Sequence, residues 1–344
     1  MPKGLVFLLN PGALPVTDVL RLEHLNIDFS GDDGPLRAVH DLSLAVPRGG
    51  IVCLVGESGC GKSLTARAVM GLLPEGARAS GRILLETPKG TEDVLALPAR
   101  HLRSLRGSCM AMIFQEPMTA LNPVLRVGRQ VDEVLRLHLG MSREEARTET
   151  LRLFSEVGIP APESRYNDYP HRLSGGMRQR VMIAAALACS PSLLLADEPT
   201  TALDATIQGQ ILRLIHEQSR KNGMAVLLIT HDLSVVGQMA DSVGVMYAGR
   251  LVEWGDTGAL LDDPAHPYTQ GLLRCAPDRA LMGARRLPAI SGTVPPLGQI
   301  PPGCPFAPRC SRAQDDCRTS PPPLRPLDAR HAVACFHAGE RNGQ

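Results

Sequence analysis

The sequence is poor in aromatic residues, carries almost no net charge and contains no long apolar run. Aromatic side chains make up 3% of the 344 residues, and 36 basic residues are balanced by 35 acidic ones. A surface that binds nucleic acid needs an excess of positive charge, and one that stacks on bases needs aromatic rings. No apolar stretch reaches the roughly 18 residues that a membrane-spanning helix requires. These absences argue against a nucleic-acid-binding protein and predict a chain without membrane-spanning helices.

The N-terminal segment does not fit a targeting signal. Residues 4–14 are mildly apolar, but Asn10, Pro11 and Gly12 interrupt them. A secretory signal peptide has a longer apolar core and a small-residue cleavage site. We therefore expect residues 1–16 to form a disordered leader and the protein to be cytoplasmic by default. The length of the chain allows one large domain and a smaller one.

Short apolar segments alternate with helical stretches over most of the chain. Nearly all-apolar segments occur at 51–55, 110–114, 193–196 and 226–229. Continuous apolar strands that alternate with helices indicate a parallel sheet covered on both faces. The alternating pattern at 19–47 predicts antiparallel strands, and the patterns at 127–140 and 143–157 predict amphipathic helices. The expected fold class is α/β, with an antiparallel β subdomain and a helical insert at about 116–176.

A glycine-rich segment, GESGCGKS at 56–63, follows one apolar segment and precedes a predicted helix, which is the context of a phosphate-binding loop. Its backbone N–H groups would surround phosphates, Lys62 would reach the β and γ oxygens, and the Ser63 hydroxyl would bind Mg²⁺. The residues expected to contact the nucleotide are Gly56, Glu57, Ser58, Gly59, Cys60, Gly61, Lys62 and Ser63. A plain glycine turn is the alternative. Cys60 is expected to be a small spacer, with a reactive thiol as the alternative.

Two adjacent carboxylates follow the apolar segment at 193–196. Asp197 is expected to hold Mg²⁺ through water, and Glu198 is the candidate base that orients or deprotonates an attacking water. An acidic pair at this place can also be an ordinary exit from a strand. The phosphate-binding loop elsewhere in the chain favours the catalytic interpretation.

Three further polar residues, Gln115, Asp204 and His231, are candidates for the same site. An open parallel sheet binds ligands at the carboxyl ends of its strands. We expect Gln115 to sense the metal or the attacking water and His231 to bond the γ-phosphate, while Asp204 would reach across an interface. Each has a structural alternative: a loop amide for Gln115, a capping histidine for His231 and a helix cap for Asp204.

A second glycine-rich turn, LSGGMRQR at 173–180, begins an apolar helix. Exposed N–H groups at a helix start, with glycines beside them, bind anions. One nucleotide does not need two such sites from one domain. We therefore expect Ser174, Gly175 and Gly176 to close on a nucleotide held by a second subunit.

The C-terminal region differs in composition from about residue 262. Proline becomes dense and periodicity fades, so 263–344 is expected to be a separate tail that is ordered only if something holds it together. Its cysteines are Cys304, Cys310, Cys317 and Cys335. In a reducing compartment such a cluster binds metal more often than it forms disulfides. The spacing C-x5-C-x6-C-x17-C is wider than that of structural zinc sites, which favours a 4Fe–4S cluster over zinc, with unligated or disulfide-forming thiols as the third possibility.

Six motifs in this order, GESGCGKS, Gln115, LSGGMRQR, LLLADEP, Thr201–Asp204 and His231, resemble the ATP-binding subunit of an ABC transporter. The resemblance covers about residues 17–260. It implies a P-loop NTPase fold, ATP hydrolysis with Mg²⁺, and a second ABC ATPase subunit, identical or homologous, stacked head to tail on this one. It also aligns Phe29 with the aromatic residue that stacks on adenine, with a plain core position as the alternative.

Three further segments, FQEPMTALNP (114–123), HPYTQGLL (266–273) and CPFAPRC (304–310), are similar to the oligopeptide/dipeptide/nickel importer subfamily. This resemblance implies a nucleotide-binding domain at 17–262 and a C-terminal extension at 263–344, and it also favours the iron–sulfur cluster. It implies two transmembrane permease subunits, an extracytoplasmic substrate-binding protein and a peripheral position on the cytoplasmic face of the cell membrane.

The cargo that this subfamily implies is di- or oligopeptides, with nickel or another small solute as the alternative. A soluble ABC ATPase that acts on DNA or ribosomes is a different class of function. Such proteins tend to carry long coiled-coil insertions or two fused ATPase domains, and neither is present here. The balanced charge also argues against it.

Overall fold

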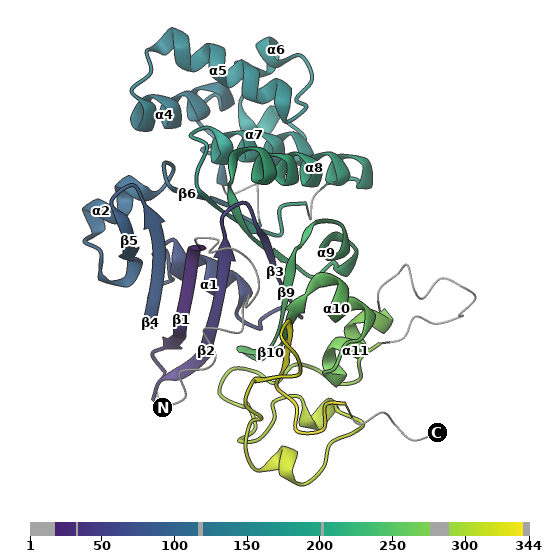
Figure 1. The fold of residues 1–344 in the computed structure, drawn as a ribbon. Coiled ribbons are helices and arrows are strands. Elements are labelled where there is room, and N and C mark those ends of the chain that lie inside the picture. The colour runs from purple at the N-terminus through teal and green to yellow at the C-terminus, as the bar shows by residue number, and fades with distance from the viewer. Residues whose placement is uncertain (1–17, 32–33, 116–119, 201–202, 276–288, 340–344) are drawn as a thin grey trace.

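The computed structural model describes residues 18–31, 34–115, 120–200, 203–275 and 289–339 (Figure 1). The predicted leader at 1–16 lies outside the described residues. Residues 116–119 of the motif FQEPMTALNP and Thr201 of the motif Thr201–Asp204 also lie outside them. The strands are β1 (Asp18–Phe29), β2 (Leu36–Pro47), β3 (Ile51–Val55), β4 (Ala77–Thr87), β5 (Gly90–Asp93), β6 (Met110–Ile113), β7 (Leu193–Asp197), β8 (Ala225–Thr230), β9 (Ser242–Tyr247), β10 (Arg250–Asp256), β11 (Arg325–Pro326) and β12 (His331–Val333).

The α-helices are α1 (Lys62–Val69), α2 (Ala99–Leu105), α4 (Val127–Leu139), α5 (Arg143–Glu156), α6 (Pro162–Tyr166), α7 (Gly175–Leu187), α8 (Ala205–Asn222), α9 (Leu233–Met239), α10 (Thr257–Asp262) and α11 (Pro267–Cys275). Short 3-10 turns are η2 (Val94–Ala96), η3 (Pro170–Arg172), η4 (Ala307–Arg309) and η5 (Asp316–Arg318).

Two sheets organise these elements. The larger has the strand order β11-β12-β10-β9-β3-β8-β7-β6, and β9, β3, β8, β7 and β6 run parallel to one another. The smaller sheet is antiparallel, with the order β2-β1-β4-β5. The four apolar segments of the sequence form β3, β6, β7 and β8. The prediction of an α/β fold with an additional antiparallel sheet is therefore confirmed.

The parallel strands are buried on both faces, as continuous apolar segments predict. In β3, Ile51, Cys53 and Val55 belong to one hydrophobic core. Val52 and Leu54 point the other way, into a second core. Helices α4, α5, α7, α8 and α9 complete the first core, and the antiparallel sheet with α1 and α2 completes the second. The strands are thus fixed from both sides, and their carboxyl ends meet at one edge of the sheet.

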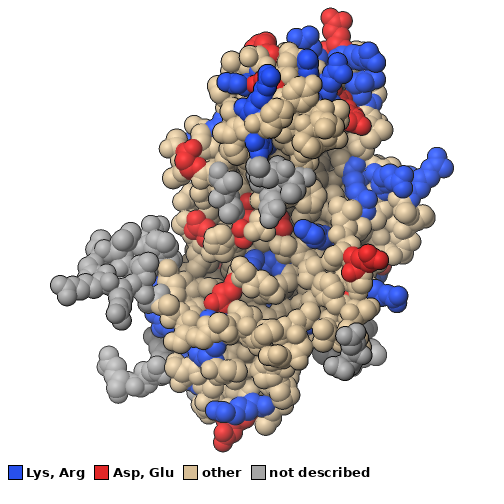
Figure 2. All heavy atoms as spheres, turned by 180° about the vertical axis from the view of Figure 1, so that it is seen from behind, with Lys and Arg blue, Asp and Glu red and all other residues tan. Residues whose placement is uncertain are grey.

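The helices between β6 and β7 form a layer at one end of the molecule (Figure 1). Among them, α4 and α5 agree within one residue with the predicted helices. A capping box starts α5, in which the Ser142 hydroxyl accepts from the N–H of Glu145 and the Glu145 carboxylate accepts from the N–H of Ser142. Seen from behind, basic and acidic side chains are mixed over the surface and are dense on this layer (Figure 2). Within the described ranges, no helix combines the length and apolar character needed to cross a membrane.

The C-terminal part is attached to the edge of the large sheet, where β12 pairs with β10 and β11 pairs with β12. On β10, the fully buried Glu253 carboxylate accepts hydrogen bonds from the N–H groups of Ala265 (2.6 Å) and His266 (3.0 Å). Nε2 of His331, on β12, lies 2.7 Å from the same carboxylate. One acidic side chain therefore joins three parts of the chain, which are strand β10, strand β12 and the segment that precedes α11. The sheet continues across the boundary that the composition predicts near residue 262.

The pair of His331 and Glu253 is expected to make this attachment depend on pH. The hydrogen bond between His331 and the Glu253 carboxylate raises the pKa of His331, because the carboxylate stabilises the charged form of the ring. The stabilisation is complete below the unfolded pKa of about 6.5 and is lost as pH rises through the folded pKa. The free energy of unfolding of the wild-type chain should therefore exceed that of His331→Gln by a margin that is largest below about pH 6.5 and shrinks as the pH rises above it. Urea denaturation at each pH measures this margin.

Comparing the wild-type chain with His331→Gln at each pH cancels what the other titrating groups contribute to the free energy of unfolding. One of these is the buried ring of His266, whose pKa burial lowers to about 4. A margin that stays constant or grows with rising pH would contradict the assigned role of His331.

Candidate active site

The phosphate-binding loop connects β3 to α1, at the carboxyl end of a central strand. Its glycines adopt backbone angles that favour glycine, with φ of 150° at Gly56 and 100° at Gly61. A Cβ on Gly56 would lie 2.2 Å from the carbonyl oxygen of Met246, so no larger residue fits there. Lys62 is buried at the start of α1, and its Nζ donates to the carbonyls of Gly56 (2.8 Å) and Glu57 (3.0 Å). The loop is compact and has a cation at its centre, as phosphate binding requires.

Ser63 and Asp197 come together where α1 begins and β7 ends. The Ser63 hydroxyl donates to Oδ1 of Asp197 at 2.9 Å. Burial raises the pKa of Asp197, although the hydrogen bond from Ser63 opposes this. A divalent cation would hold such a carboxylate in its charged form, and Mg²⁺ binds oxygen ligands while keeping several waters. The two side chains therefore fit the chemistry of a magnesium site.

Gln115, Glu198 and His231 form a second polar group. The Glu198 carboxylate accepts from Nε2 of Gln115 at 3.1 Å, and its other oxygen lies 3.1 Å from Nδ1 of His231. These residues are 83 and 33 positions away from Glu198, and they meet because β6, β7 and β8 end at the same edge of the sheet. The Glu198 side chain is 13% exposed and that of His231 is 62% exposed, so water can reach the carboxylate. The predicted base is thus oriented from two sides.

The backbone at Glu198 is strained. Its φ is 47°, in the left-handed region, which costs a residue with a side chain on the order of 1–3 kcal/mol. Its N–H donates to the carbonyl of Ile229 on β8 at 2.9 Å, and this bond helps to hold the turn. The turn lets two adjacent carboxylates face different partners, Asp197 toward Ser63 and Glu198 toward His231.

Cys60 is buried within the phosphate-binding loop, 1% exposed, with its Sγ 3.5 Å from Nζ of Lys62. Burial raises the pKa of the Cys60 thiol, although the Lys62 cation opposes this. A neutral, buried thiol is a poor nucleophile. Burial of Cys60 therefore argues against the reactive-thiol alternative and favours a small spacer.

Ser174 and Asp204 both cap helices in this chain. The Ser174 hydroxyl accepts from the N–H of Met177 at 3.3 Å at the start of α7, and Asp204 accepts from the N–H of Ile207 at 3.0 Å at the start of α8. Asp204 therefore has the helix-cap role that is the structural alternative to a contact across an interface. A Cβ on Gly175 would meet no described atom within 4 Å, so packing within the chain does not require glycine there.

Phe29 lies at the end of β1 and is half-buried. It lines a shallow depression with Gly31, Pro35 and Arg78, among others, and it belongs to neither hydrophobic core. This position argues against a plain core role for Phe29, and its stacking on adenine stays a prediction.

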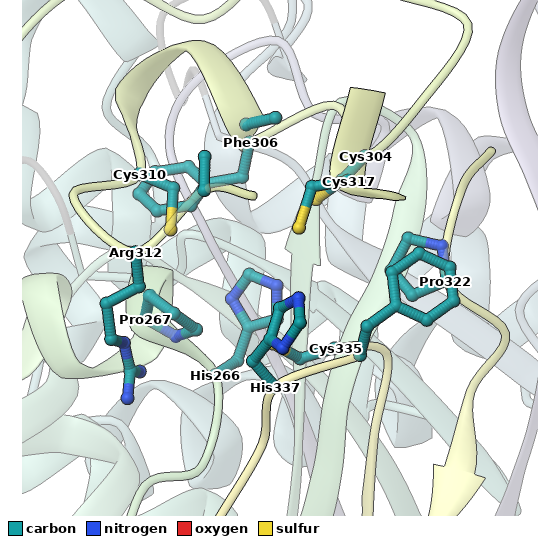
Figure 3. Close-up of a pocket in the computed structure, with 13 residues that line it drawn as sticks. His266, Pro267, Cys304, Phe306, Cys310, Arg312, Cys317, Pro322, Cys335 and His337 are labelled. Atoms are coloured by element: carbon teal, nitrogen blue, oxygen red, sulfur yellow. The ribbon is translucent and has the colours of Figure 1, made fainter. Parts of the chain in front are cut away.

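The four cysteines of the C-terminal part line one small cavity (Figure 3). All nine cysteines of the chain lie in the described residues, and none forms a disulfide. Burial raises the pKa of Cys304 to about 11 and also raises the pKa of Cys317 and Cys335, with neighbouring cysteines acting in the same direction. Thiols gathered in this way stay neutral unless a cation offsets the charge of the thiolates. Because they line one cavity, Cys304, Cys310, Cys317 and Cys335 are candidate ligands of a metal centre.

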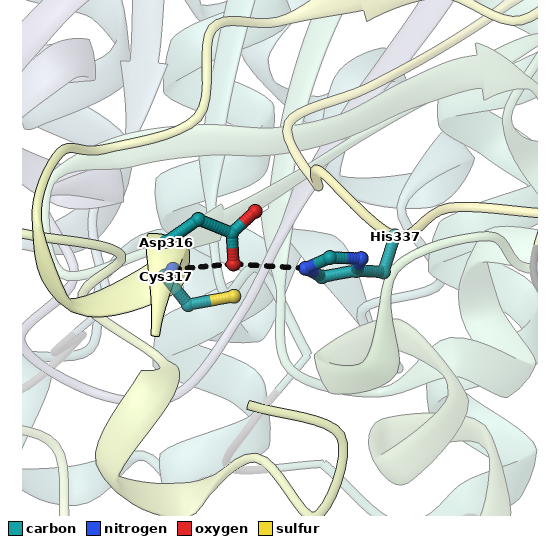
Figure 4. A group of neighbouring side chains, drawn as sticks. All are labelled: Asp316, Cys317 and His337. Atoms are coloured by element: carbon teal, nitrogen blue, oxygen red, sulfur yellow. Dashed lines mark hydrogen bonds and ion pairs between the residues drawn. The ribbon is translucent and has the colours of Figure 1, made fainter. Parts of the chain in front are cut away.

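A second group of ligand-type side chains overlaps with this cavity. Asp316, Cys317 and His337 place their potential ligand atoms within 4.8 Å of one another, and Nε2 of His337 lies 3.0 Å from Oδ1 of Asp316 (Figure 4). His337 also lines the cysteine cavity, as does His266 (Figure 3). The sequence signal for His337 is only its place two residues after Cys335. Two candidate ligand groups therefore share Cys317.

The chain matches two protein families. Residues 39–201 match the ABC transporter family, and residues 252–317 match the C-terminal region of oligopeptide/dipeptide transporters. Among solved structures, an ATP-binding cassette captured as a dimer with ADP and phosphate is similar, with a TM-score of 0.63 and 26% identity over 69% of this chain and 98% of that one. The chain belongs to the ABC transporter family and is an ATPase of that type, for which ATP and Mg²⁺ are expected.

Two curated relatives narrow the assignment. The dipeptide transport ATP-binding protein of Bacillus subtilis is 47% identical over 94% of this chain and 96% of its own length. The oligopeptide transport ATP-binding protein of Salmonella typhimurium is 47% identical over 94% of each chain. The chain therefore belongs to the oligopeptide/dipeptide branch of these ATPases, and the resemblance carried by the motifs is confirmed.

Proposed function

We propose that this chain hydrolyses ATP to energise the import of di- and oligopeptides through an ABC transporter complex. One observation carries the proposal: a group of Gln115, Glu198 and His231 occurs in the same chain as a docked C-terminal region of the oligopeptide/dipeptide type. The relatives named for dipeptide and oligopeptide transport support this cargo class over nickel or another solute.

The residues at the sheet edge support a division of roles. Lys62 offers its charge to the phosphates, while the N–H groups of the loop at 56–61 surround them. Mg²⁺ at Ser63 and Asp197, with Gln115 as a further predicted ligand, would neutralise charge on the phosphate oxygens. Glu198 orients the attacking water or accepts its proton, and its neighbours Gln115 and His231 hold the carboxylate in place.

Two further roles follow for the nucleotide. His231 is exposed enough to turn its ring toward the γ-phosphate. Phe29 would stack on adenine, and its half-buried position beside a depression supports this.

A second ATPase subunit, identical or homologous, is the first proposed partner. The open space at Gly175 would let a phosphate approach the start of α7 closely. The similar cassette was solved as a dimer with ADP and phosphate, which supports this arrangement. We infer that Ser174, Gly175 and Gly176 close on ATP bound to the partner, and that Asp204 reaches across the same interface.

Two transmembrane permease subunits and an extracytoplasmic substrate-binding protein complete the proposed complex, with this chain on the cytoplasmic face of the membrane. The helical layer is the proposed contact with the permease subunits. Val124 and Leu137, each 74% exposed, place apolar side chains on this layer and support such a contact. The mixed surface charge gives no support to the alternative of an ATPase acting on DNA or ribosomes.

Stimulation of ATP turnover in the assembled complex tests the cargo. Dipeptides, longer peptides and nickel are added separately to the complex with its substrate-binding protein present. We expect peptides to raise turnover severalfold and nickel to leave it unchanged. Stimulation by nickel alone would replace peptides as the cargo, and an active ATPase that responds to none of them would point to another solute.

We further propose that Cys304, Cys310, Cys317 and Cys335 hold a 4Fe–4S cluster. Such clusters bind four cysteine thiolates, and four thiols lining one cavity supply this set. Zinc is the alternative, and the group of Asp316, Cys317 and His337 contains ligand types that zinc accepts.

Metal analysis of two matched variants separates the alternatives. Anaerobically purified wild-type chain is expected to contain about four iron and four sulfide ions. Cys304→Ser should lose the iron, whereas His337→Ala, which alters only the second ligand set, should keep it. One zinc per chain and no iron, with zinc lost in His337→Ala and kept in Cys304→Ser, would contradict the cluster.

A further inference from the structure

The C-terminal part contacts the phosphate-binding loop directly. Arg309, in the turn between Cys304 and Cys310, donates from Nη1 and Nη2 to the two carboxylate oxygens of Glu57, at 2.6 and 3.0 Å. Glu57 is the second residue of GESGCGKS and lies 252 positions away along the chain. Two parallel hydrogen bonds fix the relative orientation of the two groups, which a single point contact would not do.

The surroundings of Arg309 hold it in this orientation. Its side chain is only 5% exposed, and its guanidinium carbon lies 5.8 Å from the ring centroid of Tyr247 and 5.9 Å from that of Phe306. It also donates to the backbone carbonyls of Ser291 at 2.9 Å and Ile290 at 3.2 Å. These contacts fix the orientation of the Arg309 guanidinium, and in this orientation it bonds Glu57 of the phosphate-binding loop.

Tyr268 makes a second contact with the same loop residue. Its hydroxyl accepts a hydrogen bond from the N–H of Glu57 at 2.8 Å, and its side chain is fully buried. The rings of Tyr247 and Phe306 pack against it, with centroids 4.7 and 5.4 Å away. The C-terminal part therefore holds Glu57 at its carboxylate and its N–H, while Lys62 bonds its carbonyl.

We propose that Arg309 and Tyr268 are positioning residues for ATP binding, which hold the phosphate-binding loop from the C-terminal part. Neither touches the reacting atoms, and both act through Glu57, at the start of the turn that surrounds the phosphates. A loop that already has its binding conformation loses less freedom when ATP binds. The inference depends neither on the cargo nor on what the four cysteines hold.

Arg309→Gln in the full chain tests this proposal. We expect the KM for ATP to rise about tenfold and kcat to change less than about twofold, because the lost loop order weakens ground-state and transition-state binding alike. Adenosine has no phosphate to contact the loop, so its affinity should equal that of the wild type. Arg330→Gln is the matched control, because Arg330 also joins the C-terminal part to a carboxylate of the large sheet, that of Asp256 at 3.5 Å. This control should keep the wild-type KM.

Two more conservative variants test the same proposal if Arg309→Gln does not fold. Tyr268→Phe removes one acceptor and keeps the ring, while Arg309→Lys keeps the charge and loses the paired donors. Both should raise the KM for ATP, by less than Arg309→Gln. A wild-type KM in these variants would overturn the proposal. So would an equal loss of ATP and adenosine affinity, or an equal rise in Arg330→Gln, because either would indicate general damage.

Discussion

Glu198→Gln is expected to lower ATP turnover by about 10²- to 10⁴-fold, the range that a positioned general base contributes. The amide has nearly the shape of the carboxylate but cannot accept the proton of the attacking water. Lys62 and Ser63, the proposed contacts with the phosphates and Mg²⁺, are unchanged, so ATP should still bind. The variant should therefore accumulate as a closed dimer with ATP bound.

Phosphate release at saturating ATP measures turnover, and size-exclusion chromatography with and without ATP measures dimer formation. Glu144→Gln is the matched control, because Glu144 is exposed on α5. It should keep wild-type turnover. Wild-type turnover in Glu198→Gln would show that Glu198 is not the base, although Gln115 and His231 contact its carboxylate.

Lys62→Ala is expected to weaken ATP binding by about 100-fold or more, because hydrogen bonds from a charged donor contribute roughly 1.5–3 kcal/mol each. The buried Nζ is the cation at the centre of the loop, and its removal also takes a donor from the carbonyls of Gly56 and Glu57. Calorimetric titration with ATP measures the loss.

Adenosine binding separates loss of the phosphate contact from loss of folding, since it should be nearly unchanged in Lys62→Ala. Lys221→Ala, at an exposed position near the end of α8, is the matched control and should bind ATP normally. Equal ATP affinity in Lys62→Ala and the wild type would exclude Lys62 as the phosphate contact. Together with Glu198→Gln, this variant separates binding from hydrolysis.

The sequence predicted those parts of the site that local chemistry determines. Glycines with positive φ, a lysine at a helix start and apolar strands buried on both faces leave contiguous patterns, so the loop at 56–63 and strands β3, β6, β7 and β8 could be located. The carboxyl ends of parallel strands meet at one edge, so the grouping of Gln115, Glu198 and His231 could be expected as well.

Elements without a contiguous pattern were not predicted. In β4 the first half is largely exposed and only the second half alternates with buried positions, so no single period covers the strand. The short strand β5 and helix α2 follow it in a segment that exposes many polar residues. Packing against β1 and the second core, rather than local propensity, gives this segment its structure.

Single polar pairs between distant segments could not be predicted either. Glu253 meets His331 across 78 positions, and Glu57 meets Arg309 across 252. Each pair is set by the way the C-terminal part packs on the sheet, which spacing does not reveal. Together with the pairing of β12 with β10, these pairs hold a proline-rich region to the core.

The central claim, that ATP hydrolysis by this chain powers peptide import, is tested most directly in proteoliposomes containing the assembled complex, by following a labelled peptide from the side of the substrate-binding protein to the side of this chain. The substrate-binding protein is supplied on its own side of the membrane and ATP on the side of this chain. The account predicts ATP-dependent movement of the peptide with the wild-type chain and none with Glu198→Gln. Equal movement with both chains, or movement without ATP, would contradict it.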